Sequence, residues 1–171
     1  MDSTTLIWLF PIAFILHDFE ELMLFEPWLK KNSGVILERV NGKIPTAFEN
    51  RLRIMLSKST TQFAFPIFLI FVLTVLSSLL AAEFGRYSFF LIASSLFFLH
   101  GFMHIGQAIF LRRYIPAVIT SVLITLPYGA VLFSRLLEEE IVSGFILCIY
   151  FLVSIVLAIP FILGMHKVGE L

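Results

Sequence analysis

Charged residues and cysteine are both scarce in this 171-residue chain. Only 14% of its residues are charged, whereas an ordinary soluble domain has about 25%. The formal net charge at pH 7 is zero, so the chain has no excess of basic residues that could recruit nucleic acid. The one cysteine, Cys148, excludes an internal disulfide and a cysteine-based zinc cluster. The composition therefore argues against a soluble globular domain, a nucleic-acid binder and a disulfide-stabilised scaffold.

Long apolar runs take the place of the missing charge. Hydrophobic residues make up 59% of the chain, twenty of them are phenylalanine, and the mean hydropathy is +0.98. A membrane-spanning helix needs about 20 mainly apolar residues, and five segments meet this requirement. We predict an all-α, polytopic membrane helix bundle. Residues 1–171 would form a single membrane domain with five transmembrane helices, at about residues 6–25, 63–82, 87–111, 114–137 and 141–165.

The basic residues predict the orientation of this bundle. With five spans, ten of the twelve Lys and Arg residues fall on one side of the membrane, in the first connection, the third connection and the C-terminal tail. Only Arg86 and Arg135 fall on the other side. Because cytoplasmic connections are enriched in Lys and Arg, we expect the N-terminus outside and the C-terminus in the cytoplasm.

The connection at about residues 26–62 is the one long polar stretch, and we predict a cytoplasmic loop there. Asn-Ser-Gly at 32–34 and Asn-Gly-Lys at 41–43 are typical of turns. A solvated basic loop that fixes the topology is the simpler interpretation. The alternative is a short amphipathic helix at the membrane interface over residues 46–56, with Arg51 and Arg53 toward the lipid headgroups.

Ionisable side chains lie inside the first predicted span, where each costs about 2.5–3.5 kcal/mol on insertion scales. His17, Glu20 and Glu21 are spaced three and four residues apart, so they share one face of a helix. Asp18 points about 100° away from His17. Such residues persist in membranes where they pair, bind a ligand or line a pathway. The first span is therefore a candidate site.

The third predicted span carries a second polar face. His100 and His104 are four residues apart, which is the spacing that zinc-binding helices use for paired imidazoles. Both helices run inward from the outside, and at 1.5 Å per residue the two polar faces reach similar depths in the cytoplasmic half of the bilayer. We expect three imidazoles and one or two carboxylates to converge there.

This set of side chains is suited to a divalent transition metal. His17, His100, His104, Glu21 and Glu20 are the candidate ligands. Zinc is favoured, and imidazole with carboxylate also suits iron or manganese. Whichever of Glu20 and Glu21 is not a ligand could act as a general base or orient a ligand. Tyr128, within the fourth span, is a further catalytic candidate as a proton donor or oxyanion stabiliser, although a packed tyrosine with a satisfied hydroxyl is the simpler interpretation.

Three segments together resemble a known family. His-Asp-Phe-Glu-Glu at 17–21 fits the pattern His-x-x-Glu-Glu near the end of a first apolar helix, and HGFMHIGQ at 100–107 and RRYIPAVITSVLITLPY at 112–128 follow in order. With this combination the chain resembles the HXXEE-domain family of small integral membrane proteins. The resemblance implies His17, Glu20 and Glu21 as signature positions, followed by a later histidine-bearing helix. It implies no activity.

Several functions are compatible with this pattern. The leading hypothesis is a membrane-embedded, metal-dependent enzyme of the hydrolase or oxidoreductase type, which acts on a lipid-like or small apolar substrate. A metal-free isomerase that moves protons with His and Glu is the second, and a metal or proton transporter is the third. A metal-free His–Glu network that only fixes helix packing is the structural alternative. The expected partners are membrane lipids and the apolar substrate, not nucleic acid. The expected location is an integral, multi-pass position, which in a bacterium would be the cell membrane.

Overall fold

The computed structural model describes the backbone of residues 1–56 and 59–168, and the side chains of these residues except 47, 48, 51, 55 and 159–168. Every regular element in this part of the chain is helical, which confirms the all-α prediction. The elements in chain order are α1 (Ser3–Val40), α2 (Thr46–Leu56), α3 (Thr60–Phe84), α4 (Tyr87–Leu111), α5 (Val118–Thr120), η1 (Ser121–Thr125), α6 (Leu126–Glu138) and α7 (Gly144–Val168).

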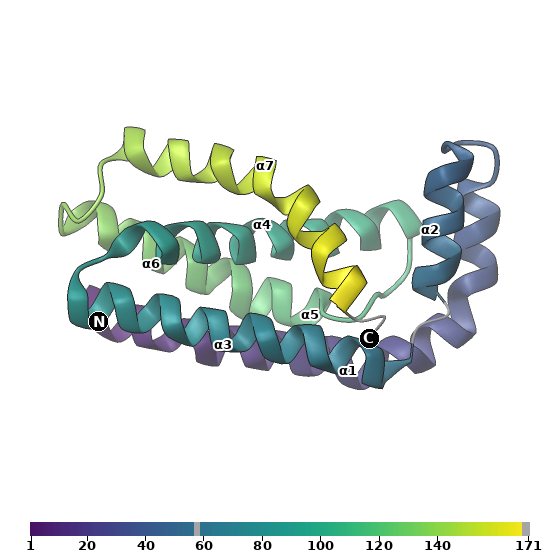
Figure 1. The fold of residues 1–171 in the computed structure, drawn as a ribbon, viewed down its shortest axis with the longest axis horizontal. Coiled ribbons are helices and arrows are strands. Elements are labelled where there is room, and N and C mark those ends of the chain that lie inside the picture. Colours follow the sequence, from purple (N-terminus) through teal and green to yellow (C-terminus); the bar gives the residue numbers. More distant parts are fainter. Residues whose placement is uncertain (57–58, 169–171) are drawn as a thin grey trace.

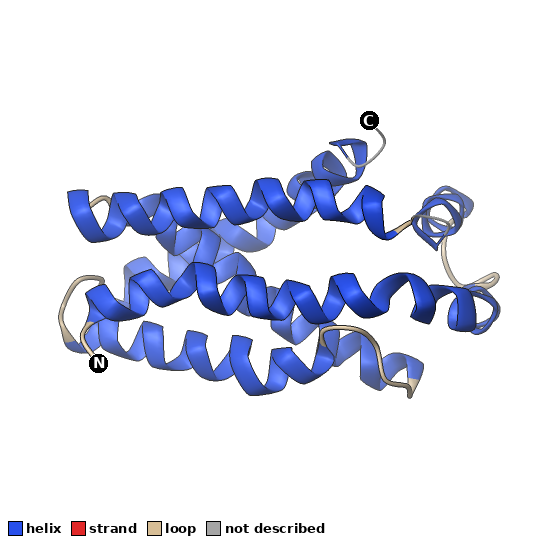
Figure 2. Cartoon of the chain, turned by 90° about the horizontal axis from the view of Figure 1, so that it is seen from below, coloured by secondary structure: helices blue, strands red, loops and turns tan. Residues whose placement is uncertain are grey.

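The long helices lie side by side along the long axis of the molecule (Figures 1 and 2). The first part of α1, then α3, α4, the continuous segment α5–η1–α6, and α7 run in alternating directions (Figure 1). α1 packs mainly against α3, and α7 lies on α4. A core of buried apolar residues fills the space between these helices, with Phe10, Phe90, Leu132 and Leu136 fully buried. The fold is an up-and-down helical bundle.

Local signals mark both ends of α3 and explain the sharp turn from α3 into α4. The hydroxyl of Ser59 accepts a hydrogen bond from the backbone N–H of Gln62, and the Gln62 side chain accepts one from the backbone N–H of Ser59. This reciprocal pair satisfies two N–H groups that α3 leaves free at its start. Gly85 ends α3 in the left-handed conformation, with φ of 63°, which glycine adopts without steric cost. Because α4 begins only two residues later, the two helices must lie antiparallel.

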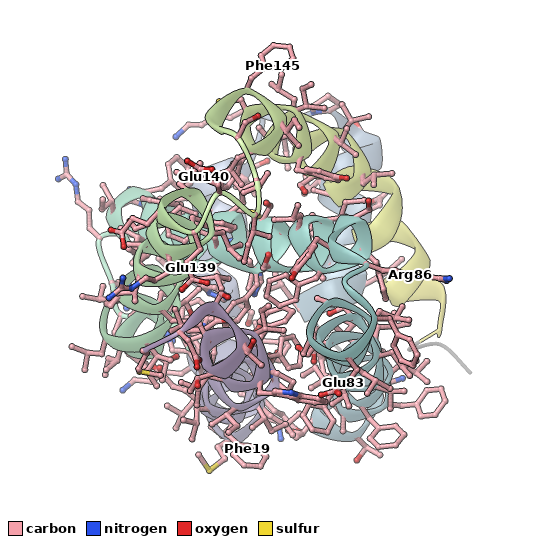
Figure 3. All side chains as sticks on the ribbon, turned by 90° about the vertical axis from the view of Figure 1, so that its left-hand side faces the viewer. Phe19, Glu83, Arg86, Glu139, Glu140 and Phe145 are labelled. Atoms are coloured by element: carbon pink, nitrogen blue, oxygen red, sulfur yellow. The ribbon has the colours of Figure 1, made fainter. Side chains whose placement is uncertain are left out.

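Among the described residues, three helices have the length and composition to cross a membrane: Thr60–Phe84, Tyr87–Leu111 and Val118–Glu138. The described apolar part of α7, Gly144–Ala158, is a shorter candidate. Many large apolar side chains point outward from the bundle, among them Phe19 and Phe145 (Figure 3). These helices agree with the predicted membrane location. α1, which carries His17, Asp18, Glu20 and Glu21 in its first half, is not among these helices.

The polar connection differs from the predicted loop because α1 continues through it to Val40. Asn-Ser-Gly at 32–34 is helical and not a turn: Asn32 is buried, its amide donates to the carbonyl of Trp28 at 2.8 Å, and Arg113 donates to its Oδ1 at 3.3 Å. The Asn41–Gly42 turn is present, with Gly42 at φ of 68°. After it, the alternative helix over residues 46–56 is present as α2. The sequence alone predicts a loop because the contact of Asn32 with the distant Arg113 is not visible in it.

The second half of α1 turns away from the bundle axis and runs beside α2 (Figure 1). Pro27 lies within α1, and because proline removes one helical hydrogen bond it accounts for such a bend. Glu26 anchors this corner: it accepts hydrogen bonds from Lys30 at 2.7 Å and from the backbone N–H and hydroxyl of Thr60 at 2.8 and 2.9 Å. The Lys30 bond, followed by those of Thr60, lowers the pKa of Glu26 to about 2. The start of α3 is thereby held against α1.

The fourth apolar segment begins at Val118 and not near residue 114. Ile115 precedes Pro116, and the residue before a proline disfavours helical backbone angles. Ala117 then takes the left-handed conformation, with φ of 67°. The chain therefore re-enters the bundle through a tight connection whose backbone N–H groups face α1.

One close helix contact gives a test of this packing. A Cβ atom added to Gly129 of α6 would lie only 2.2 Å from Cδ2 of Phe98 on α4. We expect Gly129→Ala to destabilise the protein by about 1–3 kcal/mol, since overpacking forces side chains and backbone to shift. Thermal unfolding of the full chain in detergent measures this as a lower Tm. The control is Gly106→Ala, whose added Cβ meets nothing within 4 Å. Equal Tm values for the two variants would contradict the contact.

Candidate metal centre

Four of the predicted site residues come together between α1 and α4. His17 and Glu21 lie on α1, and His100 and His104 lie on α4. One ligand atom from each of them can be chosen so that all four atoms lie within 4.8 Å of one another. Nε2 of His100 is 2.8 Å from Nε2 of His104, and each of these nitrogens is 3.8 Å from Oε2 of Glu21. We call this set the His–Glu cluster.

The spacing within the His–Glu cluster fits a metal ion. Two ligands of a tetrahedral zinc ion lie about 3.4 Å apart, because Zn–N and Zn–O bonds are about 2.0–2.2 Å long. The observed separations of 2.8 and 3.8 Å fall on either side of this value. His17 is fully buried, and its Nε2 has no hydrogen-bond partner among the described residues. A buried nitrogen without a partner is rare, and a cation would supply one.

His17 is held from the other side by two threonines. Its Nδ1 lies 3.2 Å from the hydroxyl of Thr120 and 3.1 Å from the hydroxyl of Thr125. At about 100° per residue, positions five apart on an α-helix point about 140° away from each other. Here η1 is a π-helical turn, in which the N–H of Leu126 bonds to the carbonyl of Ser121, and this turn brings both hydroxyls to one imidazole. π-turns of this kind are frequent at functional sites.

Gly101 permits the close approach of α4 to this turn. A Cβ atom at this position would lie 2.9 Å from Cγ2 of Thr125. The backbone of α4 therefore packs directly on η1 between the turns that carry His100 and His104. This close approach of α4 to η1 brings His100 and His104, as well as Thr120 and Thr125, into contact with His17.

Glu20 lies outside the His–Glu cluster and binds α5 and the connection before it. Its carboxylate accepts hydrogen bonds from the Tyr114 hydroxyl at 2.6 Å, from the backbone N–H of Thr120 at 2.7 Å and that of Ile119 at 3.4 Å, and from the Thr120 hydroxyl at 2.7 Å. Partial burial and the bond to Glu20 raise the pKa of Tyr114 above its usual range. Glu20 thus satisfies N–H groups at the start of a helix, as an acidic cap does.

The remaining candidates are placed elsewhere. The hydroxyl of Tyr128 donates to the carbonyl of Leu6 at 2.9 Å, and its ring stacks on Phe10 with the centroids 6.3 Å apart. Tyr128 is thus a packed residue of the apolar core with a satisfied hydroxyl. Asp18 is buried, is not a member of the His–Glu cluster, and has one oxygen, Oδ2, without a partner among the described residues.

Thr120 and Thr125 were not found from the sequence. Residues five apart match neither the helical nor the strand period, so no periodic signal marks them. Only the π-turn, which depends on the packing of η1 against α4 and α1, places them together. Their hydroxyls belong to the site because they orient an imidazole, as outer hydrogen-bond partners orient the histidines of metal sites.

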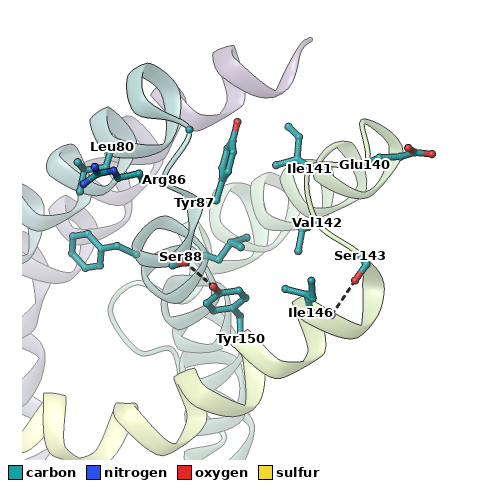
Figure 4. Close-up of a pocket in the computed structure, with 13 residues that line it drawn as sticks. Leu80, Arg86, Tyr87, Ser88, Glu140, Ile141, Val142, Ser143, Ile146 and Tyr150 are labelled. Carbon is teal, nitrogen blue, oxygen red and sulfur yellow. Dashed lines mark hydrogen bonds between the residues drawn. The ribbon is translucent and has the colours of Figure 1, made fainter.

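A cavity and a larger hollow border the described part of the bundle. A cavity of about 220 Å³ adjoins the His–Glu cluster, with Glu21 and His104 in its wall. A larger hollow of about 780 Å³ lies near the opposite end, between the α3–α4 and α6–α7 turns (Figure 4). There Tyr150 donates to Ser88 at 2.8 Å, and Arg86 and Glu140 lie on opposite sides (Figure 4). The larger hollow contains none of the predicted site residues.

The hydrogen bonds predict the tautomer of His17. The Thr120 hydroxyl has one hydrogen, and its 2.7 Å contact with the charged Glu20 is much shorter than its 3.3 Å contact with the Ala117 carbonyl. Only its lone pairs then face His17, so the Thr120 contact favours the tautomer in which Nδ1 of His17 carries the proton. Nε2 is left with its lone pair directed away from the threonines, which is the form that binds a metal.

We therefore expect nitrogen NMR of the histidine side chains in the metal-free protein to show His17 protonated on Nδ1. Thr120→Val and Thr125→Val together remove both hydroxyls while keeping the shape, and should give a mixture of tautomers. Thr74→Val is the matched control, because among the described residues the Thr74 hydroxyl bonds only within α3, to the carbonyl of Phe71. A His17 protonated on Nε2 in the unsubstituted protein would contradict this assignment.

Comparison with known proteins gives one match. The family model described as "Protein of unknown function with HXXEE motif" matches residues 8–132. No curated protein and no solved structure matches the chain. The matched region runs from α1 through most of α6 and contains all four members of the His–Glu cluster. The chain belongs to the HXXEE family.

Proposed function

We propose that this protein is a membrane-embedded, metal-dependent enzyme that acts on a lipid-like or small apolar substrate. The observation that carries the proposal is the convergence of three imidazoles and one carboxylate in the His–Glu cluster. Ionisable groups inside a membrane are costly and mark functional sites. The unpartnered Nε2 of His17 supports a cation there.

Each residue takes a stated role in this proposal. His17, His100 and His104 would hold the ion through one ring nitrogen each. Glu21, at 3.8 Å from two of these nitrogens, would be the fourth ligand or the general base. We assign Glu20 a positioning role because its carboxylate is occupied by α5 and Tyr114. We assign Tyr128 a packing role.

The metal would determine the reaction class. Zinc lowers the pKa of a bound water and supports hydrolysis, whereas iron supports oxidation. In either case the chain supplies a preorganised site in which His17 is fully buried, with Phe97 against it at 5.4 Å between ring centroids. Zinc remains the favoured ion, with iron or manganese as the alternatives, because imidazole and carboxylate ligands suit all three.

One observation favours a metal-free isomerase as the second candidate. The 2.8 Å contact between Nε2 of His100 and Nε2 of His104 is a good hydrogen bond if one nitrogen donates and the other accepts. Glu21 beside this pair could then exchange a proton with a substrate without any metal. This candidate predicts activity that resists chelators.

A transporter is less well supported. A conduction pathway needs polar groups through the whole membrane thickness, roughly 30 Å. Between the His–Glu cluster and the end of the bundle near the N-terminus, the core is closed by buried apolar side chains that include Phe10, Phe90 and Leu132. The site is therefore better described as a dead end.

We further propose that the five helical segments along the bundle axis all span the membrane, with the N-terminus outside and the C-terminus in the cytoplasm. The distribution of basic residues supports this orientation. The end of the bundle seen in Figure 3 carries Glu83, Arg86, Glu139 and Glu140, and would face outward. The end with α2 would face the cytoplasm, which places the His–Glu cluster in the cytoplasmic half.

Cysteine labelling tests this orientation. In a Cys148→Ser background, a membrane-impermeant maleimide should label Glu83→Cys in intact cells and Asn41→Cys only after permeabilisation. Both positions are exposed and lie at opposite ends of the bundle. Labelling of both after permeabilisation is the control for reactivity. Labelling of Asn41→Cys alone in intact cells would reverse the orientation, and labelling of both would contradict the topology.

Metal analysis tests the proposed site. Purified full-length protein should contain about one equivalent of zinc, iron or manganese, and His100→Ala or Glu21→Gln should lose most of it, since removing one ligand weakens a four-ligand site. Glu83→Gln is the matched control, because this carboxylate is exposed at the end of α3. Zinc would favour hydrolysis and iron oxidation. Unsubstituted protein that binds none of the three metals would contradict the metal-dependent function.

A further inference from the structure

The cavity beside the His–Glu cluster has a polar end and an apolar body. Glu21 and His104 line one part of it, and the other walls come from the second half of α1, from α2, from the end of α4 and from residues 115–116. Leu29 and Ile36 contribute from α1, and Leu52 and Leu56 contribute from α2. The extension of α1 and the presence of α2 thus build a chamber next to the cluster.

The composition of the walls indicates the chemical class of the occupant. Glu21, His104 and Gln107 are the polar residues that line the cavity, and the others are apolar. A cavity with a few convergent polar groups in an apolar lining is typical of a small-molecule site. Its occupant should therefore be an amphiphile, with a polar group toward Glu21 and His104 and a hydrocarbon part toward α2.

The size of the cavity narrows this class further. Its volume of about 220 Å³ is below the roughly 300–1,000 Å³ of pockets for drug-sized ligands. One hydrocarbon chain segment fits such a space, whereas a fused sterol ring system or a lipid with two chains does not. The cavity is thus selective for single chains by volume.

The surroundings indicate the route of entry. Phe110 lines the cavity and at the same time exposes 57% of its surface on the outside of α4. In the proposed orientation this rim faces the cytoplasmic leaflet. A single-chain amphiphile can therefore enter sideways from the lipid, while Leu52 and Leu56 of α2 keep the chamber covered on the aqueous side.

We propose that this cavity binds the hydrocarbon chain of a single-chain amphiphile and places its polar group at Glu21 and His104. The inference rests on the proposed function for the reaction that follows, because the bound polar group would lie at the metal. The binding itself depends on the walls of the cavity and does not require the ion.

Tryptophan fluorescence provides the test. Trp28 lines the cavity, where its indole N–H donates to the carbonyl of Tyr114 at 2.7 Å. The chain has two tryptophans, so Trp8→Phe leaves Trp28 as the sole reporter. The probe is ω-bromodecanol, whose bromine quenches nearby indole fluorescence, added to the full chain in vesicles of two-chain phosphatidylcholine with a chelator. We expect saturable quenching of Trp28 that unbrominated decanol reverses.

Matched variants connect this signal to the cavity. Leu52→Phe and Leu56→Phe fill the chamber and should weaken probe binding about tenfold, which corresponds to about 1.4 kcal/mol. Asn50→Phe on the exposed side of α2 should leave binding unchanged. In Trp28→Phe the remaining Trp8, which is exposed on the side of the bundle, should show only linear quenching that decanol does not reverse.

The outcomes separate this inference from the proposed function. Saturable, reversible quenching in protein that binds no metal would support the cavity and contradict the metal-dependent function. Linear quenching of Trp28 equal to that of Trp8, in protein that does bind metal, would overturn the cavity and leave the metal centre standing. If the phenylalanine variants do not fold, the comparison of Trp28 with Trp8 still decides the question.

Discussion

The structure depends on the need to satisfy ionisable side chains that are buried between apolar helices. A buried charge without a partner costs several kcal/mol, so His17, Glu20 and Glu21 constrain everything that packs on α1. Glu20 holds α5 and the connection before it through four hydrogen bonds, three from α5 and one from Tyr114. Glu21 and His17 face the two histidines of α4. The HXXEE motif thus joins three segments of the chain at one depth.

The two adjacent glutamates of the motif have different tasks because they point in different directions. Successive residues on a helix are about 100° apart, so Glu21 faces α4 while Glu20 faces the start of α5. The Thr120 hydroxyl connects the two sides, since it contacts both Glu20 and Nδ1 of His17. Glu20 lies outside the His–Glu cluster, but through Thr120 it still helps to orient the imidazole of His17, which belongs to the cluster.

The two polar helix faces of the site follow from residue spacing along single helices, whereas their surroundings depend on contacts between distant segments. The spacing of His17 and Glu21, and of His100 and His104, indicated two polar helix faces, and the structure brings these faces together. The π-turn that delivers Thr120 and Thr125 arises from packing between distant segments, which periodicity does not report. The continuation of α1 through residues 32–34 is likewise supported by a contact with a distant residue, since Arg113 donates a hydrogen bond to Asn32. These missed features supply the orientation of His17 and one wall of the cavity, so the sequence predicted the members of the His–Glu cluster better than their surroundings.

X-ray absorption at the metal edge of the purified protein tests the central claim most directly, because it reports the atoms bound to the ion. A metal held by the His–Glu cluster should show imidazole scattering from three histidines and one carboxylate oxygen at about 2.0–2.2 Å, and His17→Ala should reduce the imidazole count by one. A spectrum with only oxygen neighbours, unchanged in His17→Ala, would show that the ion lies elsewhere and would contradict the account.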